Sequence, residues 1–230
     1  MPTLAEQLLL TAINPKNGRP YARSSNALPY SLSGAFLAEL MLRANVELRK
    51  KKIVVINDQA DHPLLQETIV MIQKQKRPMT PKHWVSKLKS EFKQIQKIVA
   101  QHLENDGQIT IEEKKILGLF TSQNYQINDP NHLGHLRDSF TEILHKGEAG
   151  TPFNQGDERY IVLLSLIEAS KLLSIVYPTG KEAQAAQKQL KHVNKNLPVS
   201  KAVKETIQAI EVSVIAAIAV TTTSSNQSNS

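Results

Sequence analysis

The chain has 230 residues, of which 40% are hydrophobic, 21% are charged and only 5% are aromatic. That length can bury a substantial core, while the few aromatic residues and the 9 glycines argue against an aromatic-rich β-sandwich. Lysine and arginine total 28 against 21 acidic residues, and the net charge of +7 favours an anionic membrane, nucleic acid or acidic proteins as partners.

Cysteine and long apolar segments are both absent from the sequence. Without cysteine the chain cannot form a disulfide, an iron–sulfur cluster, a thiolate zinc site or a cysteine nucleophile. The apolar run at 8–10 is short and follows Glu6, so it does not predict a signal peptide. The best candidate span, 212–220, is far below the roughly 20 residues that cross a bilayer. We therefore expect a cytoplasmic protein whose contact with a membrane surface is peripheral.

Two apolar segments near the N-terminus predict helices. Leu4 to Ala12 is apolar-rich, and a dense turn signal at 14–20 ends the predicted helix. After a polar loop, residues 34–42 form a strongly apolar run that predicts a deeply buried second helix.

A short hairpin and a third helix follow. Residues 46–48 and 53–56 read as strands on either side of the basic cluster 49–52, which lies at the hairpin tip. Such a cluster is typical of a solvated turn, with phosphate contact as the alternative. Helical spacing returns over 64–74.

One long amphipathic helix is predicted from Pro81 to Asn105, with Thr80 as its N-cap. Its buried stripe consists of Trp84, Leu88, Phe92, Ile95, Val99 and Leu103. Lys89, Lys93 and Lys97 form a second stripe. Like charges four residues apart repel by about 0.2–0.5 kcal/mol per pair. The lysine stripe therefore indicates an anionic partner, and a plain solvated face is the alternative.

Residues 109–127 predict two short strands joined by a loop. An isolated two-stranded ribbon is marginal in water, so its apolar residues must pack on the helix, join another subunit or touch a membrane. Core packing is the default. The residues predicted for a membrane or homo-oligomer contact are Leu117, Leu119, Phe120, Tyr125 and Ile127.

The second half of the chain predicts further helices. One begins after Pro130 and ends at Gly147, and a run at 160–176 is apolar nearly all round, which places it at the centre of a helical core. Polar helical spacing covers 181–193, and a last helix is predicted over 202–220.

The fold class that these elements indicate is mainly α, a single-domain helical bundle around a hydrophobic central helix, with short β-hairpins. The domain is predicted to span 1–220. Residues 221–230 contain only threonine, serine, asparagine and glutamine, which predicts a disordered polar tail.

Compact catalytic motifs are absent, including glycine-rich phosphate loops, Gly-x-Ser-x-Gly and His-Glu-x-x-His, so we expect no enzyme, no catalytic residue and no cofactor. His132, His135 and Asp138 have a spacing that can place three ligands on one helix face. Polar helix faces carry such residues routinely, so we expect no metal site. Glu39 lies in an apolar helix and needs a partner, and Arg43 one turn later is the simplest ion-pair partner.

Several segments together resemble the Golgi phosphoprotein 3 family. They are the leucines 8–10 followed by the Gly18 turn, GAFLAELMLR (34–43), PLLQE (63–67), WV (84–85) with Leu88, LENDG (103–107), LGLF (117–120), DERY (157–160) and ASKLL (169–173). No single motif is diagnostic, but their order and spacing are specific and cover most of the chain. The resemblance implies a largely α-helical domain with a hydrophobic central bundle and a protruding hairpin. It also implies a peripheral membrane protein that binds phosphatidylinositol 4-phosphate.

The resemblance also implies where the lipid headgroup binds. Characterised members meet it with a tryptophan after the first glycine turn, an arginine just before the second helix and two arginines on the long helix. Those positions fall here at Arg23 or Ser24, at Ser33, and at Lys93 and Gln96. With the neighbouring cations added, the predicted lipid-binding residues are Arg23, Ser24, Ser33, Lys89, Lys93, Gln96 and Lys97.

Two other functions fit the same pattern. A basic helix followed by a hairpin is also typical of a winged-helix nucleic-acid reader, but Gln94 and Gln96 are the few base-reading side chains beside the lysines, which disfavours nucleic acid. The other alternative is a protein-binding adaptor without lipid specificity, because eukaryotic members of the family also contact tails of membrane proteins. The leading interpretation is a peripheral protein that binds anionic lipids through its lysine face.

Overall fold

The computed structural model describes residues 2–116, 120–196, 208, 212 and 214–216. Most of the helix predicted at 202–220, and all of the tail predicted at 221–230, lie outside these residues. The described helices are α1 (Leu4–Ala12), η1 (Ala22–Ser24), α2 (Leu28–Leu42), α3 (Pro63–Gln73), α4 (Pro81–Glu91), α5 (Ile95–Asn105), α6 (His132–Glu148), α7 (Gln155–Ala169), α8 (Leu173–Val176) and α9 (Gly180–Asn196). The described strands are β1 (Ile13–Asn14), β2 (Arg19–Pro20), β3 (Val46–Arg49), β4 (Lys52–Val55), β5 (Ile109–Ile116) and β6 (Phe120–Ile127), which pair as antiparallel hairpins. The predicted mainly α fold with short hairpins is confirmed.

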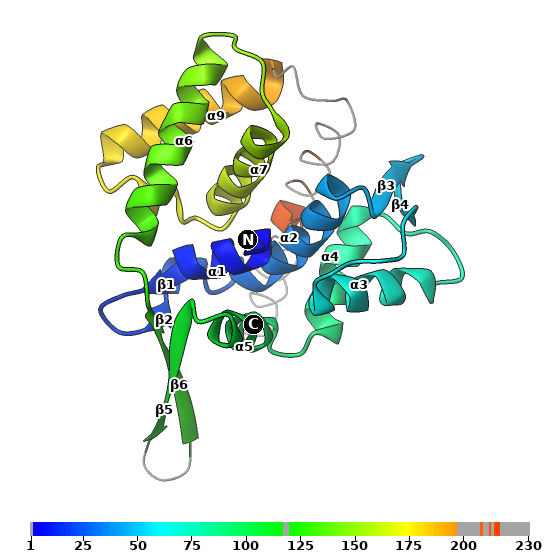
Figure 1. Ribbon diagram of the computed structural model, residues 1–230, viewed down its shortest axis with the longest axis horizontal. Coiled ribbons are helices and arrows are strands. Elements are labelled where there is room, and N and C mark those ends of the chain that lie inside the picture. The colour runs from blue at the N-terminus through cyan, green and yellow to red at the C-terminus, as the bar shows by residue number, and fades with distance from the viewer. Residues whose placement is uncertain (1, 117–119, 197–207, 209–211, 213, 217–230) are drawn as a thin grey trace, which may run out of the picture.

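The hydrophobic centre of the bundle is α1 and α2 (Figure 1). Every residue of α1 is buried, and so is every residue of α2 from Tyr30 to Leu40. Because these helices are apolar all round, they are covered on several sides, by α4, α5 and α7. The apolar run predicted at 160–176 belongs to this core, since Ile161 to Ile167 are all buried.

That apolar run does not form one helix. Lys171 adopts a left-handed conformation with φ of 61°, and α7 therefore ends at Ala169 before the short helix α8 begins. The amide of Leu172 donates to the carbonyl of Ile167, which closes the end of α7.

The segment predicted as one helix from Pro81 to Asn105 is two helices with a break at 92–94, so that prediction is wrong. Phe92 leaves the helical conformation and packs its ring edge-to-face on Phe36, with 5.6 Å between the ring centroids. Gln94 follows with a left-handed φ of 60°. The apolar stripe looks continuous in sequence because both helices bury their apolar faces in the same core, α4 against α2 and α5 against α1.

Among the described residues, Glu39 is the buried charged side chain that accepts the most hydrogen bonds. The predicted pair with Arg43 is confirmed, with Nε 2.8 Å from Oε1. Arg159 on α7 also donates from Nη1 to both Glu39 oxygens, at 2.6 and 2.7 Å, and the Leu4 amide donates at 2.8 Å. Burial raises the pKa of the Glu39 carboxyl, but the hydrogen bonds and charges of Arg159 and Arg43 outweigh it and hold the pKa below its usual value. One carboxylate therefore joins α1, α2 and α7.

Two hairpins were predicted, and both form. In β3–β4, Arg49 pairs with Lys52, so Lys50 and Lys51 alone make the turn, at φ of 50° and 62°. The β5–β6 ribbon projects from the body of the molecule, and its register pairs Ile116 with Phe120 (Figure 1).

The base of the β5–β6 ribbon is held from two sides. The Tyr125 amide donates to the Gly18 carbonyl at 2.7 Å, and the Ile111 amide donates to Glu104 of α5 at 2.9 Å. Gly18 lies in the β1–β2 turn at a positive φ of 65°, where a Cβ atom would lie 2.9 Å from the Tyr125 nitrogen. Glycine is therefore required at this turn.

Candidate functional site

The predicted lysines lie along the break between α4 and α5, and we call this segment the α4–α5 junction: Lys89, Lys93 and Lys97. Lys89 is on the last turn of α4, Lys93 is in the break and Lys97 is in the first turn of α5, and all three are exposed. Lys89 Nζ lies 5.4 Å from the ring centroid of Tyr30, the geometry of a cation–π contact. In the described ranges none of the three lysines makes an ion pair, whereas Lys87 nearby bonds Glu91 at 3.3 Å.

The start of α5 has an unusual charge arrangement. Helix N-termini carry partial positive charge, which favours acidic side chains there and disfavours cations by about 0.3–1 kcal/mol each. The first turn of α5 contains no acidic residue and its N-cap, Gln94, makes no side-chain capping bond. Lys93 precedes this turn and Lys97 lies within it. Such an end can accept an anion, because the first amide groups of a helix lack partners within the helix and two exposed lysines lie at this end of α5.

Two predicted lipid-binding residues are not at the surface, and for them the prediction is wrong. The Ser24 hydroxyl is buried and donates to the Tyr21 carbonyl at 2.8 Å. The Ser33 hydroxyl is buried inside α2 and donates to the Pro29 carbonyl at 2.9 Å. Helix α2 begins at Leu28, earlier than predicted, so Ser33 lies within the helix and not before it. A buried hydroxyl that already has an acceptor is not available to a headgroup.

Unlike the junction lysines, Arg23 has a hydrogen-bond partner and Gln96 is not fully exposed. Arg23 is exposed, and its guanidinium donates to the Ser174 hydroxyl of α8. Gln96 is half-buried in the first turn of α5. The exposed cations of the predicted set are therefore Arg23 and the three lysines.

The residues predicted for a membrane contact on the hairpin fall into two groups. Tyr125 is only 6% exposed, so the prediction that it contacts a membrane is wrong. The same burial raises the pKa of its phenol. Ile127 is half-buried and packs on the core at the ribbon base. Leu117, Leu119 and the side chain of Phe120 lie outside what the structure describes, so their contact stays a prediction.

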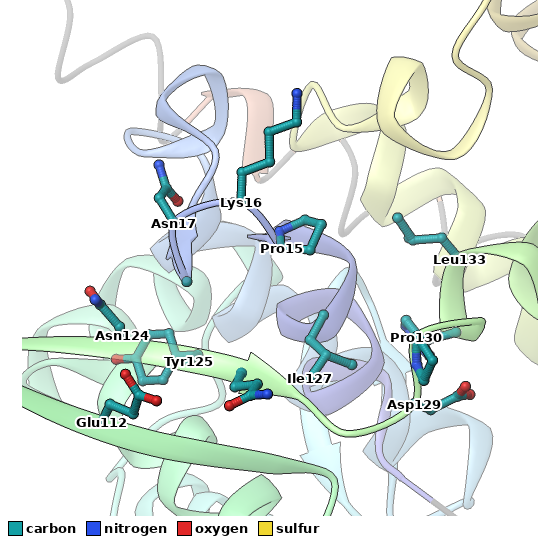
Figure 2. Close-up of a pocket in the computed structure, with 13 residues that line it drawn as sticks. Pro15, Lys16, Asn17, Glu112, Asn124, Tyr125, Ile127, Asp129, Pro130 and Leu133 are labelled. Atoms are coloured by element: carbon teal, nitrogen blue, oxygen red, sulfur yellow. The ribbon is translucent and has the colours of Figure 1, made fainter.

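A cavity of about 480 Å³ lies between the β1–β2 turn, β6 and the start of α6 (Figure 2). Lys16 and Asn17 line it from the turn, and His132 lines it from α6. Burial lowers the pKa of His132, a nearby Asp129 opposing that effect, so the imidazole is predominantly neutral at pH 7. His135 instead faces Asp129, with 3.4 Å between Nδ1 and Oδ2. The cavity has one lysine and no cluster of cations, which makes the α4–α5 junction the better anion site.

The structure also brings together three side chains that no sequence spacing connects, Glu6, His62 and His102. Along the chain, 56 residues separate Glu6 from His62, and 40 residues separate His62 from His102. No local motif signals such a cluster, and sequence reasoning missed it.

The sequence model of a family described as Golgi phosphoprotein 3 (GPP34) matches residues 4–210. None of the curated proteins gives a match. Among the described residues, no helix has the length and apolar character needed to cross a membrane.

Proposed function

The chain belongs to the Golgi phosphoprotein 3 family, and from this premise we propose that it is a peripheral membrane protein that binds anionic phospholipid headgroups at the α4–α5 junction. The observation that carries the proposal is the charge at the start of α5. Lys93 and Lys97 are exposed, make no ion pair with any residue that the structure describes, and lie at a helix N-terminus whose first turn has no acidic residue. This arrangement opposes helix stability and is relieved by a bound phosphate.

The strength of the contact can be bounded. Each basic residue near an anionic membrane contributes about 1 kcal/mol, so Arg23 and the junction lysines supply about 4 kcal/mol, equivalent to a millimolar dissociation constant. A second attachment is required for stable binding. The apolar sequence LGLF at 117–120, which follows Ile116 in the chain, is the proposed second contact.

The finer proposal is a preference for phosphatidylinositol 4-phosphate. Its phosphate monoester carries more charge than a phosphodiester and presents three acceptor oxygens, which suits an N-terminus flanked by Lys93 and Lys97. Lysine acts as a point charge and lacks the bidentate fork of arginine. We therefore expect the preference to be modest and binding to other anionic lipids to persist.

Co-sedimentation with vesicles tests the proposal. The vesicles contain neutral lipid alone, or neutral lipid with phosphatidylserine, phosphatidylglycerol or phosphatidylinositol 4-phosphate, each at low and high salt. We expect binding to every anionic vesicle, reduced by salt, and strongest for phosphatidylinositol 4-phosphate. Binding to none of them would refute the proposal.

Two further experiments distinguish lipid binding from the alternative functions, nucleic-acid binding and protein binding. Duplex DNA that binds more tightly than the vesicles and displaces them would indicate a nucleic-acid reader. Capture of membrane-protein tails that survives reversal of the junction lysines, while vesicle binding is lost, would show an adaptor role separate from the lipid site.

A further inference from the structure

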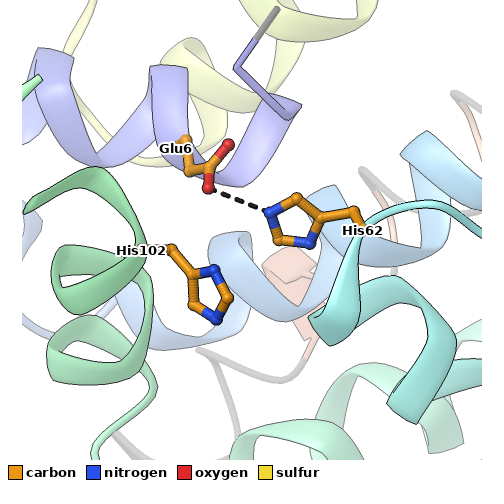
Figure 3. Close-up of side chains that lie close together, drawn as sticks. All are labelled: Glu6, His62 and His102. Carbon is orange, nitrogen blue, oxygen red and sulfur yellow. Dashed lines mark hydrogen bonds and ion pairs between the residues drawn. The ribbon is translucent and has the colours of Figure 1, made fainter. Parts of the chain in front are cut away.

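Glu6, His62 and His102 converge from three separate elements (Figure 3). Glu6 is on α1, His62 is the residue before α3, and His102 is on the last turn of α5. Glu6 Oε1 lies 3.0 Å from His62 Nε2, and the imidazole rings of His62 and His102 have centroids 5.1 Å apart. One ligand-type atom from each residue lies within 4.8 Å of the other two. Figure 3 shows a ring nitrogen of His102 turned toward the Glu6–His62 pair.

Glu6 is a pre-positioned carboxylate. Its Oε2 accepts from the amide and the hydroxyl of Thr3, at 2.6 and 2.9 Å, which completes the capping box of α1. Its Oε1 is left facing the histidines. Burial raises the pKa of Glu6, but the hydrogen bonds from His62 and Thr3 outweigh burial and hold the pKa below its usual value. The carboxylate is therefore ionised at neutral pH.

His62 is not a fully satisfied buried histidine. Its side chain is 16% exposed, and Nδ1 is buried without a hydrogen-bond partner in the described part of the chain. Because Nε2 is the nitrogen that faces Glu6, Nδ1 is left for the outer hydrogen-bond partner, here a water, that a metal-bound imidazole usually has. His102 is half-buried, so the cluster is open toward solvent on its side.

From this geometry we propose that Glu6, His62 and His102 bind one zinc-class divalent ion, with Glu6 Oε1, His62 Nε2 and a ring nitrogen of His102 as ligands and water in the fourth position. Two imidazoles and one carboxylate are a donor set that zinc prefers, whereas magnesium and calcium prefer oxygen ligands alone. Tetrahedral ligands about 2.0–2.1 Å from zinc lie about 3.3 Å from one another. Glu6 and His62 are already near that spacing, and rotation of the partly exposed His102 ring completes the set.

The ion would join three parts of the chain that the core also holds together. It would replace the hydrogen bond between Glu6 and His62 and connect α1, the start of α3 and α5. Because the three ligands are far apart in sequence, the unfolded chain lacks the site, and the ion stabilises the folded protein. The site is separate from the α4–α5 junction, because His102 is on the last turn of α5, whereas the junction lysines are on the last turn of α4, in the break and on the first turn of α5.

Zinc binding to the tag-free, chelator-treated full chain tests the proposal. Calorimetry with zinc alone should give one ion per chain, and zinc should raise the melting temperature. Cobalt in place of zinc should give the visible absorption of a tetrahedral site. His102→Ala should weaken zinc binding by more than about tenfold, since it removes a direct ligand. His145→Ala, which removes an exposed histidine of α6, is the matched control and should leave zinc affinity unchanged.

Glu6→Gln is the second variant, since it keeps the side-chain size and an oxygen for the Thr3 amide while removing the charge. It should remain helical by circular dichroism and should also bind zinc more weakly. Absence of saturable binding to the wild-type chain would overturn the proposal. So would equal zinc affinity in His102→Ala and His145→Ala, because binding would then come from scattered surface histidines.

Discussion

Replacement of Arg159 by leucine tests the role of the buried Glu39 carboxylate. The change removes three hydrogen bonds, two to Glu39 and one from Nη2 to the Pro2 carbonyl at 2.7 Å. Glu39 is 1% exposed, so its carboxylate would stay buried with a weaker set of partners. Removing one partner of a buried pair costs about 3–5 kcal/mol. For a chain of this size that loss lowers the melting temperature by roughly 6–20 °C.

Arg43→Leu is the matched control, because Arg43 bonds the same carboxylate from a side chain that is 35% exposed. Solvent screens this pair, and the expected cost is about 0–1 kcal/mol. Urea unfolding followed by circular dichroism measures both variants. Equal losses for Arg159→Leu and Arg43→Leu would refute the reasoning.

The pH dependence gives a second readout for the same variant. In the wild type the pKa of Glu39 is lowered, so its contribution to stability is complete above the ordinary carboxyl pKa and is lost as pH falls through the folded value. In Arg159→Leu the Glu39 carboxylate keeps only Arg43 and the Leu4 amide as partners and gains a proton more readily. The difference in unfolding free energy between wild type and variant should therefore narrow from pH 7 to about pH 4.3. A difference that does not change with pH would contradict this account.

Three variants at positions with a positive φ give further predictions. Gly18→Ala places a Cβ 2.9 Å from the Tyr125 nitrogen at a positive φ, so we expect about 1–3 kcal/mol of destabilisation in urea unfolding, and an unchanged midpoint would contradict the turn geometry. Lys50→Asn with Lys51→Gly suits the left-handed turn of β3–β4 and should raise stability by about 1 kcal/mol, whereas a loss would show that the lysines are not strained. Gln94→Gly should also raise stability, by up to about 1 kcal/mol, because glycine adopts the left-handed break without strain; a lower melting temperature would refute this.

Local patterns were enough to predict most of the fold. The apolar run at 4–12 and the strands around 49–52 form where the sequence indicates, since caps, turns and side-chain periodicity are encoded by neighbouring residues. The break at 92–94 was missed because the apolar stripe runs through it without interruption. Only the packing of Phe92 on Phe36 reveals that the chain changes direction there.

The candidate sites depend on contacts that a single sequence does not show. Glu39 was predicted to need a cation, but Arg159 lies 120 residues away and no spacing links the two. Ser33 looked like a surface residue before a helix, and the earlier start of α2 buries it. Convergence of Glu6 with two histidines likewise arises from helix packing. The three lysines were found because charge periodicity is local, although the break changes how they are arranged.

Reversal of charge at the α4–α5 junction tests the central claim most directly. The variant Lys93→Glu with Lys97→Glu is compared with Lys188→Glu with Lys191→Glu, which makes the same charge change at exposed positions of α9. Binding to vesicles with phosphatidylinositol 4-phosphate at low salt is the measurement. Loss of two cations at about 1 kcal/mol each weakens binding by about thirtyfold or more at the junction, with a much smaller effect at α9. Equal weakening in both variants would contradict a headgroup site at the junction and leave only the net charge of the protein as the cause.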